Sequence, residues 1–240
     1  MTLSVDPKLI DNYAHYYDQD EDLPEWRRLG ALDKCQNIVL LCSRLQRDEI
    51  LEIGCGEGAL LERLIALKLG SKFTGLEISP SAVRCVSKKK LPNLEIQLFD
   101  GYQTPYEDKR FDVAILSHVI EHVEYPRKLI SEAARVAKTV FLEVPLEDNG
   151  RLSDDFVFDR VGHINFYNIK TIRSLVQSCG MKILDAHLSH SARAIYVYRK
   201  GPWKGTLSYL IKELGLRVWP KAATRWFTYH YSLIYSKPQS

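Results

Sequence analysis

The sequence contains no apolar run of the roughly 20 residues that a helix needs to cross a bilayer, so we expect no transmembrane segment. Its first eight residues lack a basic stretch followed by an apolar one, which predicts that no secretory signal is present. None of its five cysteines forms a Cys-x-x-Cys pair, and five is an odd number. Scattered, unpaired thiols favour a reducing, cytoplasmic compartment.

The 240 residues are enough for one α/β domain with additions, and their composition is typical of a globular protein. The net charge of +3 is unevenly distributed. From Lys200 onward, seven basic residues and one acid, Glu213, give +6, so the rest of the chain carries −3. This asymmetry predicts that the last forty residues form a contact surface.

Apolar runs typical of strands alternate with runs typical of helices. The predicted strands are Ile50–Ile53, Phe73–Ile78, Leu94–Phe99, Phe111–Leu116 and Thr139–Val144. The predicted helices are Ala59–Leu69, Ser79–Lys90, Tyr125–Ala137 and Asn168–Cys179. This alternation predicts an α/β fold with a doubly wound, mostly parallel sheet, in which all carboxyl ends of the parallel strands lie along one edge.

Segments at both ends extend this core. Glu25–Leu45 is predicted to be a helix lying across the domain, and Met181–Leu188 with Ala192–Tyr198 an antiparallel pair that closes the sheet. We therefore divide the chain into an N-terminal helical cap (1–46), a core (47–200) and a basic, helical and aromatic C-terminal extension (201–240).

Three glycines follow the first predicted strand, in the run Gly54-Cys55-Gly56-Glu57-Gly58. Such a turn brings backbone N–H groups close to a ligand. The spacing is not the G-x-G-x-x-G of dinucleotide sites, and Glu57 would repel a pyrophosphate. A ligand with a zwitterionic amino-acid end, its ammonium near acids such as Glu52, matches the charges better.

Acids also end the next two strands. Glu77 is placed to accept hydrogen bonds from ribose hydroxyls, and Asp100 to accept one from an adenine amino group beside Gly101 and Tyr102. Alone, the glycines could be turn formers, Glu77 a helix cap and Asp100 a turn residue. Their agreement at four strand ends, with Ser117-His118-Val119 at the fourth, favours one shared ligand site.

Taken together, these motifs resemble the class I S-adenosylmethionine-dependent methyltransferases, over roughly residues 48–145. The matching runs are Leu51–Gly58, Gly75–Ser79, Phe99–Gly101, Phe111–Val113 and Ser117–Val123. Gly162–Tyr167, followed by a helix, resembles a segment of the small-molecule branch of that family. The resemblance implies a Rossmann-like methyltransferase fold, S-adenosylmethionine as cofactor and S-adenosylhomocysteine as product.

The resemblance also implies which residues bind the cofactor. The glycines back its methionine part, Glu77 binds the ribose, and Asp100 with Gly101 holds the adenine. Residues of the N-terminal segment close over it. The full set of expected cofactor-binding residues is Tyr13, Tyr17, Arg27, Glu52, Gly54, Cys55, Gly56, Gly58, Glu77, Ile78, Asp100, Gly101, Tyr102, Ser117, His118 and Val119.

Three histidines are candidates for the general base that an acceptor of high pKa requires. In order of preference they are His118, His163 and His122; His122 would share a helix face with His118 if that segment is helical. His118 could instead be a wall of the cofactor pocket, Glu121 a helix cap, and His122 a packing residue beneath it.

Glu121 and the three histidines could also form a metal site of imidazole and carboxylate ligands. The segment is similar to that of small-RNA 2′-O-methyltransferases, which have Glu-x-x-Glu-His and a later histidine, but His118 replaces the first glutamate. The Glu-His pair also occurs in metal-free relatives, so we expect no metal.

We expect a small-molecule acceptor, methylated on oxygen or nitrogen, in a pocket formed by the N-terminal aromatics, the 146–167 loop and the aromatic tail. One alternative is an RNA-modifying enzyme whose basic tail tracks phosphates. Another is a non-catalytic cofactor-binding protein whose tail docks a partner or an anionic membrane. The tail could also be a helical cap or a homodimer contact.

Overall fold

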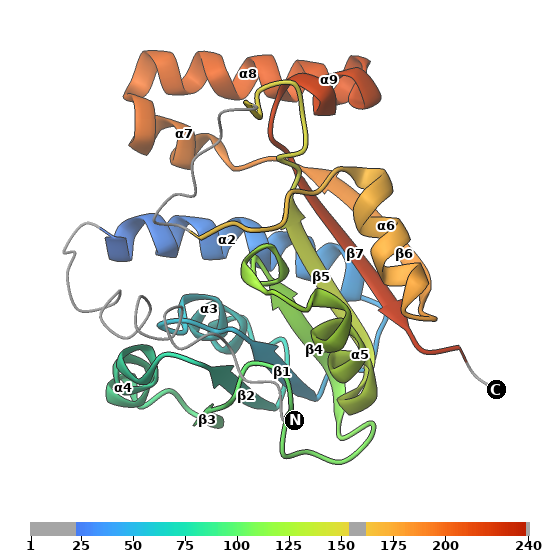
Figure 1. Cartoon of the computed structure of the whole chain (residues 1–240). Coiled ribbons are helices and arrows are strands. Elements are labelled where there is room, and N and C mark those ends of the chain that lie inside the picture. Colours follow the sequence, from blue (N-terminus) through green and yellow to red (C-terminus); the bar gives the residue numbers. More distant parts are fainter. Residues whose placement is uncertain (1–22, 154–161, 239–240) are drawn as a thin grey trace.

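The structure, a computed structural model, describes residues 23–153 and 162–238 (Figure 1). Tyr13 and Tyr17 lie outside the described residues. The strands are β1 (Glu49–Ile53), β2 (Lys72–Glu77), β3 (Leu94–Leu98), β4 (Phe111–Ser117), β5 (Ala137–Pro145), β6 (Lys182–Ser189) and β7 (His230–Ser236). They form one seven-stranded sheet of order β3-β2-β1-β4-β5-β7-β6.

Strands β1 to β5 pair in parallel, and β7 runs antiparallel to both β5 and β6. This confirms the predicted α/β class, with a mostly parallel sheet and antiparallel pairing at its last strands. The carboxyl ends of β1, β2, β4 and β5 lie along one edge, where parallel α/β sheets bind ligands.

Helices cover both faces of the sheet, as Figure 1 shows. They are α2 (Leu23–Cys42), α3 (Ala59–Ala66), α4 (Pro80–Lys89), α5 (Pro126–Val136), α6 (Ile169–Ser178), α7 (Arg193–Lys200), α8 (Pro202–Val218) and α9 (Pro220–Trp226), with a short 3-10 turn, η1 (Ile120–His122). The expected helix starts are present. Ser79, directly before Pro80 at the start of α4, accepts a hydrogen bond from Ala82 N on its side chain. Asn168, directly before α6, forms a capping box with Thr171.

Two apolar cores hold these layers together. One packs α2 and α3 against one side of the sheet around Ile50, Ile115 and Phe141. The other packs α5 and α6 against the opposite side around Leu116, Leu142 and Tyr235. The predicted N-terminal helix is therefore part of the domain's own packing.

The strand predicted at Ala192–Tyr198 is wrong, because this segment is helix α7. A short apolar run is ambiguous between helix and strand, and here the neighbouring residues Ile195 and Tyr196 are both buried. Gly201 ends the helix at φ +77°, and α8 folds back so closely that a Cβ on Gly205 would lie 2.5 Å from the Tyr196 carbonyl oxygen.

The antiparallel partner of β6 comes instead from the aromatic run near the end of the chain. Strand β7 lies between β5 and β6, and Tyr235 is fully buried with its hydroxyl donating to Ile130 O (3.1 Å). Residues 201–240 thus contribute a strand to the sheet as well as helices α8 and α9, which lie beyond α7 and away from the sheet (Figure 1). Among the residues the structure describes, no helix has the length and apolar character needed to span a membrane. The three-part division stays a prediction.

Two leucines of the last forty residues test this placement. Leu233 of β7 is fully buried, whereas Leu214 of α8 is 63% exposed. We expect Leu233→Ala to lower the free energy of unfolding by about 2–5 kcal/mol through loss of burial and a cavity. Leu214→Ala should change it by less than about 0.5 kcal/mol. Urea denaturation would measure both, and equal effects would contradict the placement of β7.

Candidate functional site

The glycine turn after β1 has a backbone that only glycine adopts readily. Gly54, Gly56 and Gly58 have φ of +74°, +54° and +77°. A Cβ on Gly54 would lie 2.7 Å from a methyl group of Val119, so the loop after β4 packs directly on the turn. Gly54 N also donates to Leu76 O of β2 (2.8 Å). The turn is therefore fixed between the ends of three neighbouring strands.

Glu77 joins this turn to β2. Its carboxylate accepts hydrogen bonds from Gly56 N (2.7 Å), Ile78 N (2.8 Å) and Ser79 N (3.0 Å). Burial raises the pKa of Glu77, although these three N–H groups oppose the rise. The side chain is thus held in one position at the end of β2, where the sequence predicts a ribose-binding acid.

Glu52 is a buried acid with an incomplete set of partners. It is 4% exposed, and its Oε2 has no hydrogen-bond partner among the residues that the structure describes. Burial raises the pKa of Glu52 to about 8, against the opposing charge of Lys34. An orphaned carboxyl oxygen beside a glycine turn fits a cationic ligand group such as an ammonium.

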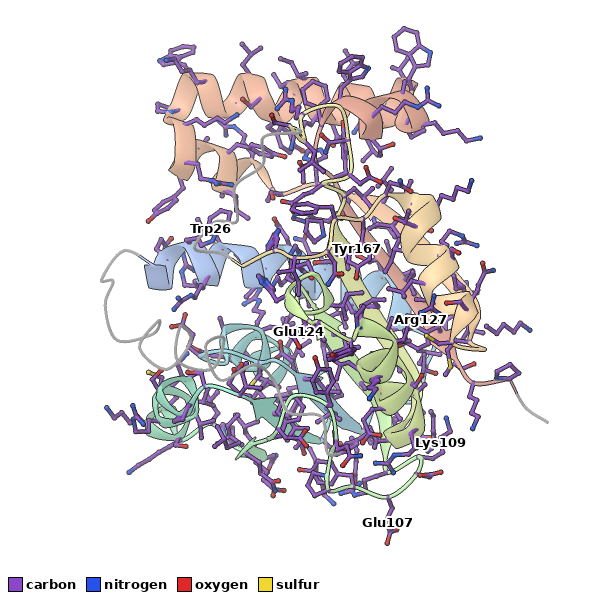
Figure 2. The ribbon with its side chains drawn as sticks, viewed as in Figure 1. Trp26, Glu107, Lys109, Glu124, Arg127 and Tyr167 are labelled. Atoms are coloured by element: carbon purple, nitrogen blue, oxygen red, sulfur yellow. The ribbon has the colours of Figure 1, made fainter. Side chains whose placement is uncertain are left out.

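A cavity of about 920 Å³ lies along the carboxyl edge of the sheet. This volume is at the upper end of the range for small-ligand sites. The predicted residues that line it are Arg27, Glu52, Gly54, Cys55, Gly56, Glu77, Ile78, Gly101, Tyr102, Ser117, His118, Val119, His122 and His163. Trp26 on α2, labelled in Figure 2, and Arg199 on α7, whose guanidinium lies 4.9 Å from the Trp26 ring centroid, form its wall toward the C-terminal helices.

Two predicted cofactor residues do not line the cavity. Gly58 instead caps α3. Asp100 is exposed and closes its own loop, because Oδ1 accepts from Tyr102 N (2.8 Å) and Gln103 N (2.7 Å). Asp100 thus positions Gly101 and Tyr102, which do reach the cavity.

Two other expectations concern Arg27 and Cys55. Arg27 of α2 forms an ion pair with Glu57 in the glycine turn (2.9 Å), which ties the N-terminal helix to the site. Cys55 is buried, and burial raises the pKa of its thiol well above the usual value. It is therefore a neutral, space-filling side chain in the wall of the cavity.

His118 lies between two fully buried acids. Its Nδ1 is 3.3 Å from the Glu121 carboxylate and its Nε2 is 3.3 Å from that of Glu143. Burial and Lys34 alone would lower the pKa of His118, but the two carboxylates outweigh them and raise it. Against the cost of burial, His118 in turn lowers the pKa of both acids. The three groups form a buried cluster in which the two carboxylates favour the protonated form of His118.

Glu143 also joins several elements. It accepts hydrogen bonds from Asn37 Nδ2 of α2 (2.7 Å) and Ser232 Oγ of β7 (2.6 Å). His230 at the start of β7 stacks edge-on against His118, at 5.0 Å between ring centroids, and burial lowers the pKa of His230 to about 3. Neither Glu143 nor His230 is among the residues predicted from the sequence. A charge within the apolar run Thr139–Val144 was the available signal for Glu143; His230 had none, because β7 was not recognised.

His122 and His118 do not share a helix face. His118 has a left-handed backbone (φ +58°), and the following turn η1 spans only three residues. His122 instead faces His163, at 4.6 Å between ring centroids, and burial lowers the pKa of His122. Nor is Glu121 a helix cap, because its fully buried side chain faces His118.

His163 forms a close pair with Glu147, which sequence reasoning also missed. Nδ1 of His163 lies 2.6 Å from Glu147 Oε2, and both residues line the cavity. The carboxylate favours the tautomer with its proton on Nδ1, which puts the lone pair on Nε2.

Among the described residues, histidine nitrogens and carboxylate oxygens of this site form two groups that could hold a metal ion. In each of the sets Glu121/His122/His163 and His118/Glu143/His230, one nitrogen or oxygen per residue lies within 4.8 Å of the others. The expectation of no metal therefore stays a prediction, which metal analysis of the purified protein would test.

In comparison with known proteins, a family model described as a methyltransferase domain matches residues 25–186. Curated relatives include a probable phthiotriol/phenolphthiotriol dimycocerosates methyltransferase 2 of Mycobacterium ulcerans (28% identical; 57% of this chain, 54% of the relative). Another is a ubiquinone/menaquinone biosynthesis C-methyltransferase of Campylobacter jejuni (31% identical; 55% of this chain, 56% of the relative). The chain spans between about a third and just over half of the length of the curated relatives it matches.

A similar solved structure is phosphoethanolamine N-methyltransferase 2 of Haemonchus contortus in complex with S-adenosyl-L-methionine. Its TM-score is 0.63 at 16% identity, over 87% of this chain and 53% of that one. This likeness concerns the fold. The family match covers well over half of the sequence, in agreement with the resemblance of the sequence motifs. The chain therefore belongs to this methyltransferase family.

Proposed function

We propose that this protein transfers a methyl group from S-adenosylmethionine to an oxygen or nitrogen atom of a small-molecule acceptor. The observation that carries the proposal is the pair of buried acids, Glu52 and Glu77, at the glycine turn of the 920 Å³ cavity. The relatives are named as a ubiquinone/menaquinone biosynthesis methyltransferase and a probable phthiotriol/phenolphthiotriol dimycocerosates methyltransferase, which supports a small-molecule or lipid-like acceptor.

The residues present fit this cofactor. The backbone of Gly54 and Gly56 would lie against its methionine part, and the orphaned oxygen of Glu52 would take the ammonium. Glu77, already oriented by three N–H groups, would accept from the ribose hydroxyls, and Gly101 and Tyr102 would border the adenine. When bound, the cofactor supplies a methyl group that its sulfonium has already activated.

The protein must then orient the acceptor and accept its proton. We propose His163, held by Glu147, as the general base in place of His118, the first preference from sequence. A base needs an unprotonated nitrogen, and the two carboxylates raise the pKa of His118 and so favour its protonated form. His118 would instead place a fixed positive charge in the cavity wall, and the neutral His122 would pack against His163.

Glu52→Gln tests the ammonium site, because it removes the charge and keeps the shape. We expect S-adenosylhomocysteine to bind about 10- to 100-fold more weakly, since a charge-assisted hydrogen bond contributes about 1.5–3 kcal/mol. Adenosine lacks the amino-acid end, so its affinity should be unchanged, whereas Glu77→Ala should weaken both ligands. Calorimetry measures all four pairs. Equal losses for both ligands in Glu52→Gln would contradict the assignment.

The raised pKa of Glu52 predicts a proton released on binding. At neutral pH the free carboxyl is largely protonated, with a pKa of about 8. An ammonium partner favours the carboxylate, so binding at pH 7 should release up to about one proton, and affinity should rise with pH up to about 8. Calorimetry in buffers of different ionisation enthalpy measures the release, which Glu52→Gln should abolish. No release by the wild type would contradict this role.

His163→Ala should lower kcat about 10²- to 10⁴-fold, with little change in S-adenosylhomocysteine affinity, because it removes only proton transfer. Glu147→Gln should have a smaller effect of the same kind. The assay follows an acceptor found by screening phenolic and amine metabolites. A matched His187→Gln variant, outside the cavity, should be fully active. Unchanged kcat in His163→Ala would exclude the histidine as base.

His118→Gln should lower the free energy of unfolding by about 3–5 kcal/mol, because it leaves Glu121 and Glu143 buried without their counter-charge. Besides these acids, Lys34 and His230 face His118. A histidine whose folded pKa is raised contributes stability below its unfolded pKa of about 6.5, and loses it as pH rises through the folded pKa. The difference from wild type should therefore be full near pH 6 and shrink at higher pH. A constant difference in urea denaturation across that range would show a purely steric effect.

A further inference from the structure

The outer side of the two C-terminal helices carries a continuous apolar face. Half of the large apolar side chains exposed in the described part of the chain lie between residues 203 and 226. We call them the α8–α9 face: Trp203, Leu207, Leu210, Ile211, Leu214, Val218, Trp219 and Trp226. Their spacing along α8 follows one side of a helix. In Figure 2, side chains project from α8 and α9 away from the rest of the molecule.

This face is exposed although its helix is firmly packed on the other side. Gly205 lets α8 approach α7, and the Tyr229 hydroxyl donates to Lys212 O (2.9 Å). Glu213 binds His190 Nε2 (3.0 Å) and Arg217. Because α8 is held in this orientation by its inner side, the apolar residues cannot turn inward. So large an exposed patch indicates an interaction surface.

Basic side chains flank the α8–α9 face. Lys200, Lys204, Arg217, Lys221 and Arg225 are all exposed. The one acid beyond Lys200 is Glu213, and it is engaged by His190 and Arg217. Tryptophans lie at both ends of the α8 part of the face, with Trp203 88% exposed and Trp219, at the C-cap of α8, 72% exposed. Leucines bordered by tryptophan and surrounded by lysine and arginine are typical of helices that lie in the plane of a membrane interface.

We propose that α8 and α9 dock this protein on the surface of a bilayer that contains anionic lipids, with the α8–α9 face inserted among the acyl chains. The helices would lie on the membrane and not cross it. A two-fold dimer through the same face is disfavoured, because it would bring the basic residues of one copy against those of the other.

The docked helices also connect to the cavity. Ile195 and Arg199 of α7, which packs directly under α8, line the cavity, as do Thr228 and His230 just after α9. A membrane-bound protein would therefore hold the cavity next to the bilayer. Resting on the proposed function, this predicts an amphiphilic acceptor that partitions into membranes.

Sedimentation with lipid vesicles tests the docking without any enzyme assay. Vesicles of phosphatidylcholine with about a third phosphatidylglycerol should bind the wild-type protein, and pure phosphatidylcholine should bind it at least about tenfold more weakly. Leu207→Glu/Leu214→Glu should reduce binding to anionic vesicles at least about tenfold. The matched variant Leu98→Glu should bind like wild type, because Leu98 is 55% exposed, as Leu207 is at 59%, but lies on β3. Thermal melting and S-adenosylhomocysteine binding check that each variant is folded.

Several outcomes would overturn the proposal. One is that the wild-type protein does not bind anionic vesicles at low salt, and another is that the double variant binds them as well as the wild type. A third is that binding is lost entirely at moderate salt, which would show charge attraction alone. Concentration-dependent dimers in sedimentation velocity that the double variant abolishes, without vesicle binding, would assign the face to self-association. Binding of tRNA in place of vesicles would assign the basic residues to nucleic acid. Loss of vesicle binding with cofactor binding intact would leave the proposed methyl transfer standing, so the two proposals fail separately.

Discussion

The site depends on the contacts that the buried carboxylate of Glu143 makes with its neighbours. It lies near the end of strand β5, fully buried, and its partners come from α2, from the loop after β4 and from β7. A buried charge tolerates this position only when its hydrogen bonds are complete, so the three neighbouring elements must be in register around it. His118 and Glu121 extend the same cluster toward the cavity wall. The arrangement of the active edge is thus coupled to the packing of the N-terminal helix and of the last strand.

The two pairs of histidine and glutamate at this edge differ in their surroundings. His118 has a carboxylate near each ring nitrogen, and together these two acids raise its pKa and favour the protonated ring. His163 is contacted on Nδ1 by the carboxylate of Glu147, and this contact orients its ring. We propose that these surroundings give the two histidines different roles, His118 as a counter-ion and His163 as a base.

Much of the fold follows from local patterns that the sequence shows directly. Parallel strands buried on both faces are continuous apolar runs, and the glycines, Ser79-Pro80 and Asn168 mark where helices begin. The residues around the glycine turn were likewise predictable, because turn geometry constrains them within a few positions. The errors concern long-range pairing. Ala192–Tyr198 is equally compatible with a strand until α8 folds back on it, and nothing local shows that residues 230–236 enter the sheet beside β5. Glu147 and His230 were missed because only the tertiary fold brings them to the cavity.

The position of β7 also affects how the protein is made. Glu143 and Ser232, which are bonded across β5 and β7, are 89 residues apart in the sequence. During synthesis, β1 to β5 emerge first and can pair with one another, but this edge of β5 lacks its partner β7 until residues 230–236 have been translated. Closing so long a loop is slow, and an unpaired strand edge is open to association with other chains. Nascent chains that stop before residue 230 would therefore expose both this edge and an incomplete cavity, and we expect them to be held by chaperones until the last strand is added.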